Sequence, residues 1–529
     1  MRGVLNSYLL LLCLALSCSL CRSHKILVVF PTPGIRHAIL GNACVELLLE
    51  AGHQVTYLSL APRAVKPHKN LTLIEIFLPL PIEEKITLKK TMSGDVNLNN
   101  LNEFVTNISQ LEMKFVAHER VQKFLSDPKE YFDVAILEWL CGEYIVTIPA
   151  VFGCPYIWFS STDSHSSILR LIGDVTNPAL VTTCHFKDVA PMTFMKRVSS
   201  LWDHVKLYLH SEFNVRPKED KEYQRTVAPL IAKRRGVVPS YYELLYNASL
   251  VLGNTHISVG KATSLPPAYK KVGGFHVREN REPLPKDLKD VMDKSTNGVI
   301  YFSLGATLKS DDVLKEEIEK LLIFFSGLSH TVLWKFEREI PNKPINVYTI
   351  SWAPQQSILA HRNCILFITH GGQLSILEAV HFGVPLIGIP VFADQFMNVN
   401  TLVNKGMAKR VDMSYNIADD LKAAIEEVLG NSSYTQAAKR QSFIYHQRAV
   451  SPATEILHWV EHVIQTRGAP LLRSPGLGVP WYQRTYLDFA SVVIATLIVF
   501  TLVVMKLFSV LKRVVKTVVI KLVGKKKQQ

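Results

Sequence analysis

The sequence predicts an α/β fold in which two Rossmann-like domains face one another and a C-terminal transmembrane helix follows them. Two series of apolar runs alternate with helical segments, one beginning at Lys25 and the other at Val299. An uncharged and mostly apolar segment covers residues 489–505. The length of 529 residues is sufficient for two domains, and a composition with 48% hydrophobic and 20% charged residues argues against a disordered chain.

The first series contains a candidate catalytic pair. We expect a strand at Lys25–Phe30, a helix at Ala38–Ala51 and a strand at Gln54–Leu60, with His37 in the loop between the first strand and the helix. A further strand at Asp133–Glu138 ends on a carboxylate, which could hydrogen-bond a histidine ring and fix its tautomer. By position alone, a single histidine in such a loop is more often structural than catalytic.

The second series predicts a glycine turn at the carboxyl end of a buried strand. The expected elements are strands at Val299–Leu304 and Thr331–Phe336, a helix at about 311–325, a strand at Cys364–Thr369, the turn His370-Gly371-Gly372, a helix at Gln373–Phe382 and a strand at Val384–Pro390. Such turns lie where open α/β sheets bind ligands, and a helix start suits a phosphate or diphosphate. A turn of this kind with two glycines is also common without a ligand.

Polar residues are dense around this turn, although the segment is otherwise built for burial. His370, Glu378 and Ser375 fall on or beside one stripe of the expected helix, and Asp394 and Gln395 follow the next apolar strand. Buried polar groups are costly unless something satisfies them. A sugar nucleotide would do so, because it offers a base, ribose hydroxyls, phosphates and sugar hydroxyls. We therefore predict a nucleotide site here.

Residues 352–398 carry a dense motif with the pattern W-x-P-Q, H-x5-F-x-T-H-G-G, S-x2-E-A and G-V-P-x4-P-x-F-x-D-Q-x2-N. This motif resembles the signature of the membrane-bound animal UDP-glycosyltransferases, a family with the GT-B fold, and features of invertebrate members are present. The motif covers about a tenth of the chain, and flanking features extend the resemblance over nearly its full length. The resemblance implies transfer of a hexose from a UDP-sugar to a small lipophilic acceptor.

The resemblance also assigns roles to individual residues of the expected donor site. Trp352 and Gln355 would hold the uridine, His370 and Gly372 the diphosphate, Glu378 the ribose, and Asp394 and Gln395 the transferred sugar, with Ser303 close to the phosphates. Many vertebrate relatives have Asn-Gly where this chain has Leu374-Ser375. The hydroxyl of Ser375 would replace the missing side-chain amide.

In the same resemblance, His37 corresponds to the catalytic base, and Glu138 stands where many members have an aspartate that orients the base. The reaction would then invert the sugar's anomeric configuration. Glucose is favoured over glucuronate because Glu138 and the Leu374-Ser375 pair resemble invertebrate members, many of which use UDP-glucose. The alternatives are a glucuronosyltransferase and a membrane-anchored protein that binds a UDP-sugar or a lipophile without turnover.

Other classes of function fit the sequence less well. A nicotinamide or flavin oxidoreductase is disfavoured because no G-x-G-x-x-G follows a predicted strand. No metal-ligand spacing and no D-x-D triplet occurs, so we expect no metal and no cofactor besides the UDP-sugar as co-substrate. The tail from Lys506 holds eight lysines and arginines, more than half of the formal net charge of +14, so the basic balance gives little support for nucleic-acid binding. Oligomeric state is open.

The chain is predicted to comprise a signal peptide and two domains before its anchor. Residues 1–22 form the signal peptide, 23–275 the acceptor-binding domain, 286–466 the donor-binding domain, 467–487 a juxtamembrane linker, 488–506 the transmembrane helix and 507–529 a basic tail. The stretch from Ser451 to Thr466 is a candidate helix that packs back on the first domain. Five cysteines lie beyond the signal, without the pattern of a disulfide framework.

These features predict a single-pass type I protein of the endoplasmic reticulum membrane, with lumenal domains and a cytosolic tail. The final Lys526-Lys527-Gln528-Gln529 resembles a dilysine retrieval signal, although a simple polybasic lipid contact would look similar. Glycosylation sequons begin at Asn70, Asn107, Asn247 and Asn431, which is compatible with a lumenal body.

Overall fold

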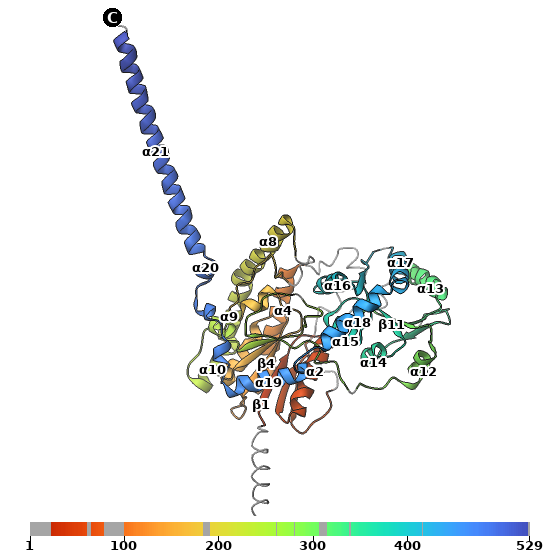
Figure 1. Cartoon of the computed structure of the whole chain (residues 1–529). Helices are drawn as coiled ribbons and strands as arrows, with labels where there is room; N and C mark the ends of the chain where they lie inside the picture. Colours follow the sequence, from red (N-terminus) through yellow and green to blue (C-terminus); the bar gives the residue numbers. More distant parts are fainter. Residues whose placement is uncertain are drawn as a thin grey trace, which may run out of the picture. The chain divides into compact units, whose positions relative to one another are not determined.

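The computed structural model describes residues 23–60, 65–78, 100–183, 191–260, 262–279, 281–305, 315–337, 340–414 and 416–526. The chain divides into two compact units, residues 1–473 and 474–529. The first unit contains two parallel sheets with helices packed around them (Figure 1). This architecture confirms the two-domain α/β fold predicted from the sequence.

The first sheet has the strand order β3-β2-β1-β4-β5-β6-β7 in the described residues, and all its neighbours are parallel. Its strands are β1 (Lys25–Phe30), β2 (Gln54–Ser59), β3 (Leu71–Glu75), β4 (Val134–Trp139), β5 (Tyr156–Ser160), β6 (Leu250–Gly253) and β7 (Tyr269–Lys271). Strands β1, β4 and β5 are almost wholly buried, which explains why each reads as a continuous apolar run rather than an alternating one.

The second sheet has the order β10-β9-β8-β11-β12-β13 and is also parallel. Its strands are β8 (Val299–Ser303), β9 (Thr331–Lys335), β10 (Val347–Ile350), β11 (Cys364–Thr369), β12 (Leu386–Gly388) and β13 (Ala408–Arg410). The predicted strand at Val384–Pro390 is therefore shorter than expected, and Pro385 lies just before it. Proline lacks the N–H that a ladder requires, which limits the strand at that end.

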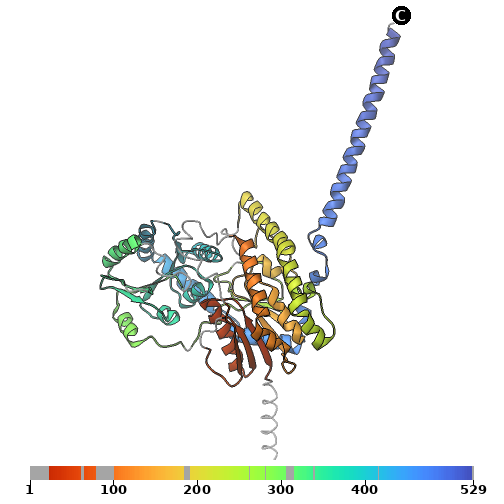
Figure 2. The same ribbon diagram turned by 180° about the vertical axis from the view of Figure 1, so that it is seen from behind.

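Helices connect the strands of each sheet and cover both sheets (Figures 1 and 2). Those of the first half are α2 (Ile35–Glu50), α4 (Leu101–Ala117), α5 (Glu119–Ser126), α6 (Thr147–Phe152), α7 (Ser166–Arg170), α8 (Phe194–His210), α9 (Arg216–Thr226), α10 (Ala228–Arg235) and α11 (Tyr241–Leu245). Those of the second half are α12 (Lys286–Lys294), α13 (Lys315–Ser326), α14 (Gln355–Leu359), α15 (Gln373–Phe382), α16 (Gln395–Asn404), α17 (Ile417–Gly430) and α18 (Ser433–His446).

The helix α2 begins earlier than the sequence predicts. It starts at Ile35 rather than Ala38, so His37 lies in the first helical turn and not in the preceding loop. Gly34 caps this helix with φ of 121°, a backbone angle that glycine adopts readily. The turn that reverses the chain therefore ends before Ile35, and the helix carries His37 at a fixed position.

The helix α19 (Pro452–Gln465) returns to the first half after the second half is complete. Its side chains Ile456, Val460 and Val463 are fully buried within the hydrophobic core of the first half, and the helix contacts α2 and β4. The packing predicted for residues 451–466 is thus present. The cap at Ser451, whose hydroxyl accepts a hydrogen bond from the Thr454 N–H, fixes where the helix starts.

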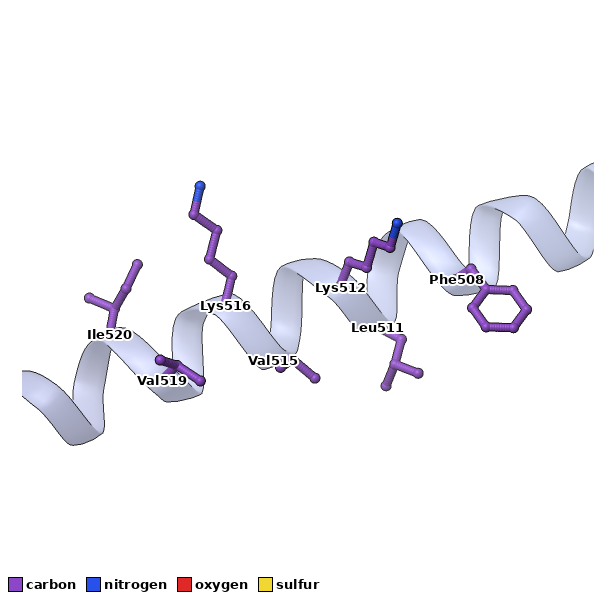
Figure 3. Close-up of a pocket in the computed structure, with 7 residues that line it drawn as sticks. All are labelled: Phe508, Leu511, Lys512, Val515, Lys516, Val519 and Ile520. Atoms are coloured by element: carbon purple, nitrogen blue, oxygen red, sulfur yellow. The ribbon is translucent and has the colours of Figure 1, made fainter.

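The second unit consists mainly of α20 (Trp481–Arg484) and the long α21 (Leu487–Lys526). Residues 487–520 of α21 are long and apolar enough to cross a membrane. The helix continues past the predicted end of the span at Lys506, because no proline or glycine interrupts the sequence before Gly524. In this extension Lys512 and Lys516 extend together from the helix beside a shallow hollow lined by apolar side chains (Figure 3).

Four of the five cysteines beyond the expected signal are in the described residues, and Cys44, Cys154 and Cys364 are free thiols. Cys44, Cys141 and Cys364 are buried, and Cys154 is partly buried. Burial raises the pKa of the Cys44 and Cys364 thiols to about 12, so these two are protonated and unreactive at neutral pH. Cys184 lies outside the described residues.

Candidate active site

The predicted site residues lie at corresponding points of the two sheets. The strand order of the first sheet reverses between β1 and β4, and that of the second reverses between β8 and β11. His37 follows β1 and Glu138 lies on β4, whereas Ser303 ends β8 and His370 follows β11. Open α/β sheets bind ligands outside such reversal points. Each half therefore presents its polar residues where its topology favours a ligand.

His37 and Glu138 contact one another through a hydrogen bond between His37 Nδ1 and Glu138 Oε1. Glu138 is 1% exposed, and its other oxygen, Oε2, accepts a hydrogen bond of 3.3 Å from the Thr32 N–H. The carboxylate is thus fixed by two partners. With Nδ1 donating to it, the imidazole keeps Nε2 as its basic nitrogen, which is the arrangement that a histidine base requires.

The glycine turn is a tight link between β11 and α15. Gly371 has φ of 81°, a region that favours glycine, and Gly372 is the N-cap of α15 without a side chain that caps the helix. The first N–H groups of α15 have no intrahelical partner, and they add to the positive end of the helix dipole. Asn398 Nδ2 donates to the Gly371 carbonyl at 3.1 Å and ties the turn to α16.

His370 is buried against this turn, with 1% of its surface exposed. Burial, together with the charges of Arg36 and Lys335, holds the pKa of His370 well below its usual value. The ring is therefore neutral at neutral pH. Its Nε2 has no hydrogen-bond partner among the described residues, so it is free to donate to, or accept from, a bound group.

The loop after β8 lies next to His370. Ser303 is 2% exposed, and its Oγ accepts a hydrogen bond of 3.3 Å from the Gly305 N–H. A Cβ added to Gly305 would lie 2.8 Å from both Arg36 Nη2 and His370 Cε1. Lys335, at the end of β9, donates from Nζ to the Gly305 carbonyl at 3.0 Å. Two loops of the second sheet and one side chain of the first half thus converge.

Gln355 and Glu378, which the resemblance assigns to the nucleoside, form one hydrogen-bonded group with Ser375. Gln355 Nε2 donates to Ser375 Oγ at 3.2 Å and to Glu378 Oε2, while Tyr301 donates to Gln355 Oε1 at 3.3 Å. Gln356 Nε2 also donates to Glu378, at 3.1 Å. Glu378 is 5% exposed, and each of its two carboxylate oxygens accepts a hydrogen bond from a glutamine side chain.

Asp394 and Gln395 lie at the start of α16. Asp394 Oδ2 accepts a hydrogen bond of 2.8 Å from Asn398, the residue that also holds the glycine turn. Gln395 is fully buried, and its Oε1 accepts from the N–H groups of Val391 and Phe392 at 2.8 and 3.2 Å. Only its Nε2 lacks a partner within the described part of the chain. The side chain of Gln395 therefore shapes the loop before α16 and offers one donor.

Trp352 differs from the residues above because its side chain is exposed rather than buried. It follows β10, and 51% of its surface is exposed. An exposed indole offers a flat apolar face on which a base can stack.

Leu374 and Gln373, at the start of α15, connect the two halves. Leu374 is buried within the hydrophobic core of the first half, and Gln373 Nε2 donates to the Asn254 carbonyl, after β6, at 2.8 Å. The Leu374 departure from the vertebrate pattern thus places an apolar side chain in the contact between halves. Ser375, its neighbour, bonds within the second half instead.

Sequence reasoning missed Arg36, Gln356 and Asn398. Arg36 immediately precedes His37, yet an arginine beside a loop reads as a solvated charge. Gln356 follows the W-x-P-Q motif directly, and Asn398 is the final asparagine of the whole pattern. Only the structure shows which groups their amides contact.

Within the described ranges, no group of three histidine, cysteine or acidic side chains is arranged to hold a metal ion. The site is thus described by hydrogen-bonding and charged side chains of the two halves.

A family model described as UDP-glucoronosyl and UDP-glucosyl transferase matches residues 25–528. Among curated proteins, UDP-glucosyltransferase 2 of Dactylopius coccus is 30% identical over 91% of this chain and 92% of its own length. UDP-glucuronosyltransferase 2B15 of Rattus norvegicus is 30% identical over 71% of this chain and 69% of its own length.

Solved structures share the fold at lower identity. Phytolacca americana UGT2, complexed with UDP-2fluoro-glucose and pterostilbene, superimposes with a TM-score of 0.53 at 18% identity and covers 83% of this chain and 99% of its own. The calicheamicin glycosyltransferase CalG4 gives a TM-score of 0.53 at 16% identity, over 84% and 98% of the two chains. The chain therefore belongs to the UDP-glucuronosyl and UDP-glucosyl transferase family, and it is a UDP-glycosyltransferase with the GT-B fold.

Proposed function

We propose that the enzyme transfers glucose from UDP-glucose to a small lipophilic acceptor with inversion of the anomeric configuration, and that His37 is the general base. The observation that supports this proposal is the His37–Glu138 pair, one residue away from Arg36, whose guanidinium lies against the glycine turn of the donor half. The expected base, His37, is thus adjacent in the chain to Arg36, and Arg36 lies against the glycine turn where the phosphates are expected.

In this mechanism His37 Nε2 takes the proton of the acceptor as the acceptor's nucleophilic atom attacks the anomeric carbon. Glu138 accepts the Nδ1 hydrogen bond, orients the ring and stabilises the imidazolium that forms. The bond from the anomeric carbon to UDP breaks on the opposite face. Since a single displacement occurs, an α-linked donor gives a β-linked product.

The donor half would hold the UDP moiety along the turn and α15. The N–H groups that begin α15 and His370 Nε2 would donate to the diphosphate. Gln355, Glu378 and the exposed Trp352 would contact the nucleoside, and Asp394 with Gln395 Nε2 the sugar hydroxyls. Binding of ribose hydroxyls to Glu378 then requires that it exchange a hydrogen bond with Gln355 or Gln356.

Glucuronate is the alternative sugar. The insect relative is named a glucosyltransferase and the rat relative a glucuronosyltransferase, and both are 30% identical to this chain over the matched residues. Parallel assays with UDP-glucose and UDP-glucuronate against the same acceptors decide between them. A higher kcat/KM with UDP-glucuronate would contradict the glucose proposal.

We place the catalytic body in the lumen of the endoplasmic reticulum, with α21 as a single-pass type I anchor and the basic tail in the cytosol. The apolar length of α21 supports the anchor, and the exposed sequon residues Asn107, Asn247 and Asn431 support a lumenal body. Digestion of microsomal protein with endoglycosidase H tests the orientation. A mass that stays unchanged after digestion and in sequon variants would count against it.

The base is tested with His37→Ala in microsomes supplied with labelled UDP-sugar and a panel of phenolic acceptors. Loss of a general base lowers turnover by about 10²–10⁴-fold, while UDP binding should persist because His37 contacts Glu138 rather than the donor turn. The exposed His458 of α19 is the matched control, and His458→Ala should keep full transfer. Transfer that survives in His37→Ala would contradict the proposed base.

A second candidate function is a UDP-sugar or lipophile binder without turnover. It requires the donor turn but not the His37–Glu138 pair. If the wild-type protein binds UDP yet transfers no sugar to any acceptor of the panel from either donor, this second function is favoured over the enzyme.

A further inference from the structure

The Arg36 side chain connects the first half of the molecule to the donor turn of the second half. A Cβ added to Gly372 would lie 2.7 Å from Arg36 Nη1, and one added to Gly305 would lie 2.8 Å from Arg36 Nη2. Gly305 follows β8 and Gly372 precedes α15, so the guanidinium of Arg36 is in contact with both loops of the second sheet. Both loops can approach it this closely because neither glycine has a side chain.

Two nitrogen atoms at this contact lack protein partners. Arg36 Nη2 and His370 Nε2 are buried, and neither has a hydrogen-bond partner in the ranges that the structure describes. A Cβ on Gly372 would lie 2.5 Å from His370 Nε2 and 2.7 Å from Arg36 Nη1, so both side chains border the same position. A buried donor without an acceptor is unfavourable, and more so when it is charged. An acceptor with several oxygens would satisfy both.

The charges around this position favour an anion. Arg36 and Lys335 are cationic, and α15 directs its N-terminus to the same place. Lys335 is paired with Glu337, and Asp394 is the carboxylate whose charge acts on Arg36. Burial lowers the pKa of Arg36, but a guanidinium remains protonated throughout the physiological range. Positive charge, a helix start and an unpaired guanidinium N–H thus share one small region.

We propose that Arg36, a residue of the acceptor-binding half, binds the diphosphate of the sugar nucleotide and neutralises the UDP leaving group. The proposal rests on the proposed function. When the acceptor atom bonds to the anomeric carbon, the bond from that carbon to the β-phosphate oxygen breaks, and its electron pair stays on UDP. The acceptor proton goes to His37. The diphosphate gains one negative charge, which the guanidinium, as a planar bidentate donor, stabilises.

The position of Arg36 next to His37 couples proton transfer from the acceptor to the departure of UDP. Both residues lie in the first turn of α2, and Gly34 sets the start of that helix. Bringing α2 to the donor turn therefore positions the base and the counter-charge of the leaving group together. Donor binding through Arg36 would thereby draw the two halves into the geometry in which transfer takes place.

The test measures dissociation constants of UDP, UMP and uridine for full-length protein in detergent, with Arg36→Gln and Arg36→Lys. In Arg36→Gln the affinity for UDP should fall by about 10–100-fold, as expected for a lost charge-assisted hydrogen bond, while uridine affinity stays unchanged. Arg36→Lys should lie between wild type and Arg36→Gln because lysine keeps the charge but not the bidentate geometry.

Arg278→Gln is the matched control. Arg278 also joins the halves, since it lies in the connecting segment and pairs with Glu46 of α2. Its loss should leave the UDP affinity at the wild-type value. Thermal unfolding of each variant without ligand shows whether the substitution alters the fold, and Arg36→Lys still tests the proposal if Arg36→Gln unfolds.

Two results would overturn the assignment. They are a UDP affinity of Arg36→Gln equal to wild type, and an equal loss of affinity for uridine and UDP. A wild-type protein that binds UDP through Arg36 but transfers no sugar would refute the proposed function and support this assignment. In contrast to Arg36→Gln, the variant His37→Ala should lose sugar transfer and keep the wild-type affinity for UDP.

Discussion

Glu138 illustrates how much of the site the sequence defines at the scale of single residues. The strand pattern showed only that a carboxylate at the end of one buried strand could hydrogen-bond a histidine after another, and the family resemblance selected His37 and Glu138 as the pair. The structure supplies what the pattern lacks, namely the hydrogen bond to His37 Nδ1 and the second hydrogen bond from the Thr32 N–H. Both depend on side-chain rotamers and on a register between β1 and β4 that spacing does not give.

Substitution of Glu138 tests the orientation of the base. Glu138→Gln keeps the size of the side chain but not its charge, so we expect kcat to fall by about 10²–10⁴-fold with UDP affinity unchanged. Glu138→Asp retains the charge and should recover part of the rate. Steady-state kinetics with separate UDP-binding measurements check this. Equal kcat values in Glu138→Gln and wild type would exclude the orienting role.

Glu219 provides a pH dependence that is separate from catalysis. It accepts hydrogen bonds from Ser109 at 2.6 Å and from Tyr241 at 2.9 Å, and burial, together with the charge of Glu143, raises its pKa from 4.5 to about 7. The folded state thus holds a proton that the unfolded state releases between those pH values. This contribution to stability is present below about pH 4.5 and is lost as the pH rises to about 7.

Glu219→Gln removes this titration. The melting temperature of the variant, minus that of wild type, should therefore be greater at pH 8 than at pH 5. The effect on the free energy of unfolding is at most about 3 kcal/mol, from the size of the pKa change. Thermal unfolding at the two pH values measures it. A difference that is the same at both pH values would mean that Glu219 titrates normally.

At the scale of elements, the sequence predicted the strands and helices around the glycine turn at residues 370–372 well. Cys364–Thr369 and Gln373–Phe382 have the predicted bounds, because a buried β-rich run, two glycines and a Gly-Val-Pro stop are strong local signals. The start of α2 and the length of β12 differed, because Gly34 and Pro385 act through backbone geometry rather than through hydrophobic pattern. The inter-half contact of Leu374 was not predictable, since it depends on a partner far away in the sequence.

The glycine turn can be tested by adding one methyl group. Gly372 has φ of −64°, so alanine fits its backbone, but the new Cβ would lie 2.5 Å from His370 Nε2 and 2.7 Å from Arg36 Nη1. We expect Gly372→Ala to raise the KM for UDP-sugar by at least about tenfold, because the methyl group displaces both side chains. Gly430→Ala is the control, since a Cβ there meets nothing within 4 Å. Similar donor KM values in the two variants would contradict the role of the turn.

For the whole molecule, the sequence indicated the two domains and the anchor. Only the structure shows how deeply the side chains of α19 are buried in the first half. Its three buried side chains complete the core of the first half, although more than 170 residues separate them from β7. Residues 177–267 show no motif, so the sequence names no residue that would contact an acceptor. Pocket shape depends on how loops pack, which local patterns do not specify.

Truncation tests the contribution of α19. A chain that ends at Gln447 lacks Ile456, Val460 and Val463, whose burial contributes about 5–9 kcal/mol, which is comparable to the stability of a typical domain. We expect it to be misfolded, whereas a chain that ends at Arg473 keeps the first compact unit and should still bind UDP. Thermal unfolding and UDP binding compare the two. Equal melting temperatures would contradict the role of α19.

The return of α19 also determines which part of the enzyme the membrane helix restrains. The chain leaves the first half after β7 and returns to it at α19, so the second half is connected to the first at two crossings. The crossings lie close together, because Arg448 Nη2 donates a hydrogen bond of 2.9 Å to the Gly273 carbonyl. In chain order, α20 and α21 follow α19 directly, apart from two short turns. A pivot at the two crossings would therefore let the second half move while the first half stays joined, through α19, to the chain that continues into α20 and α21.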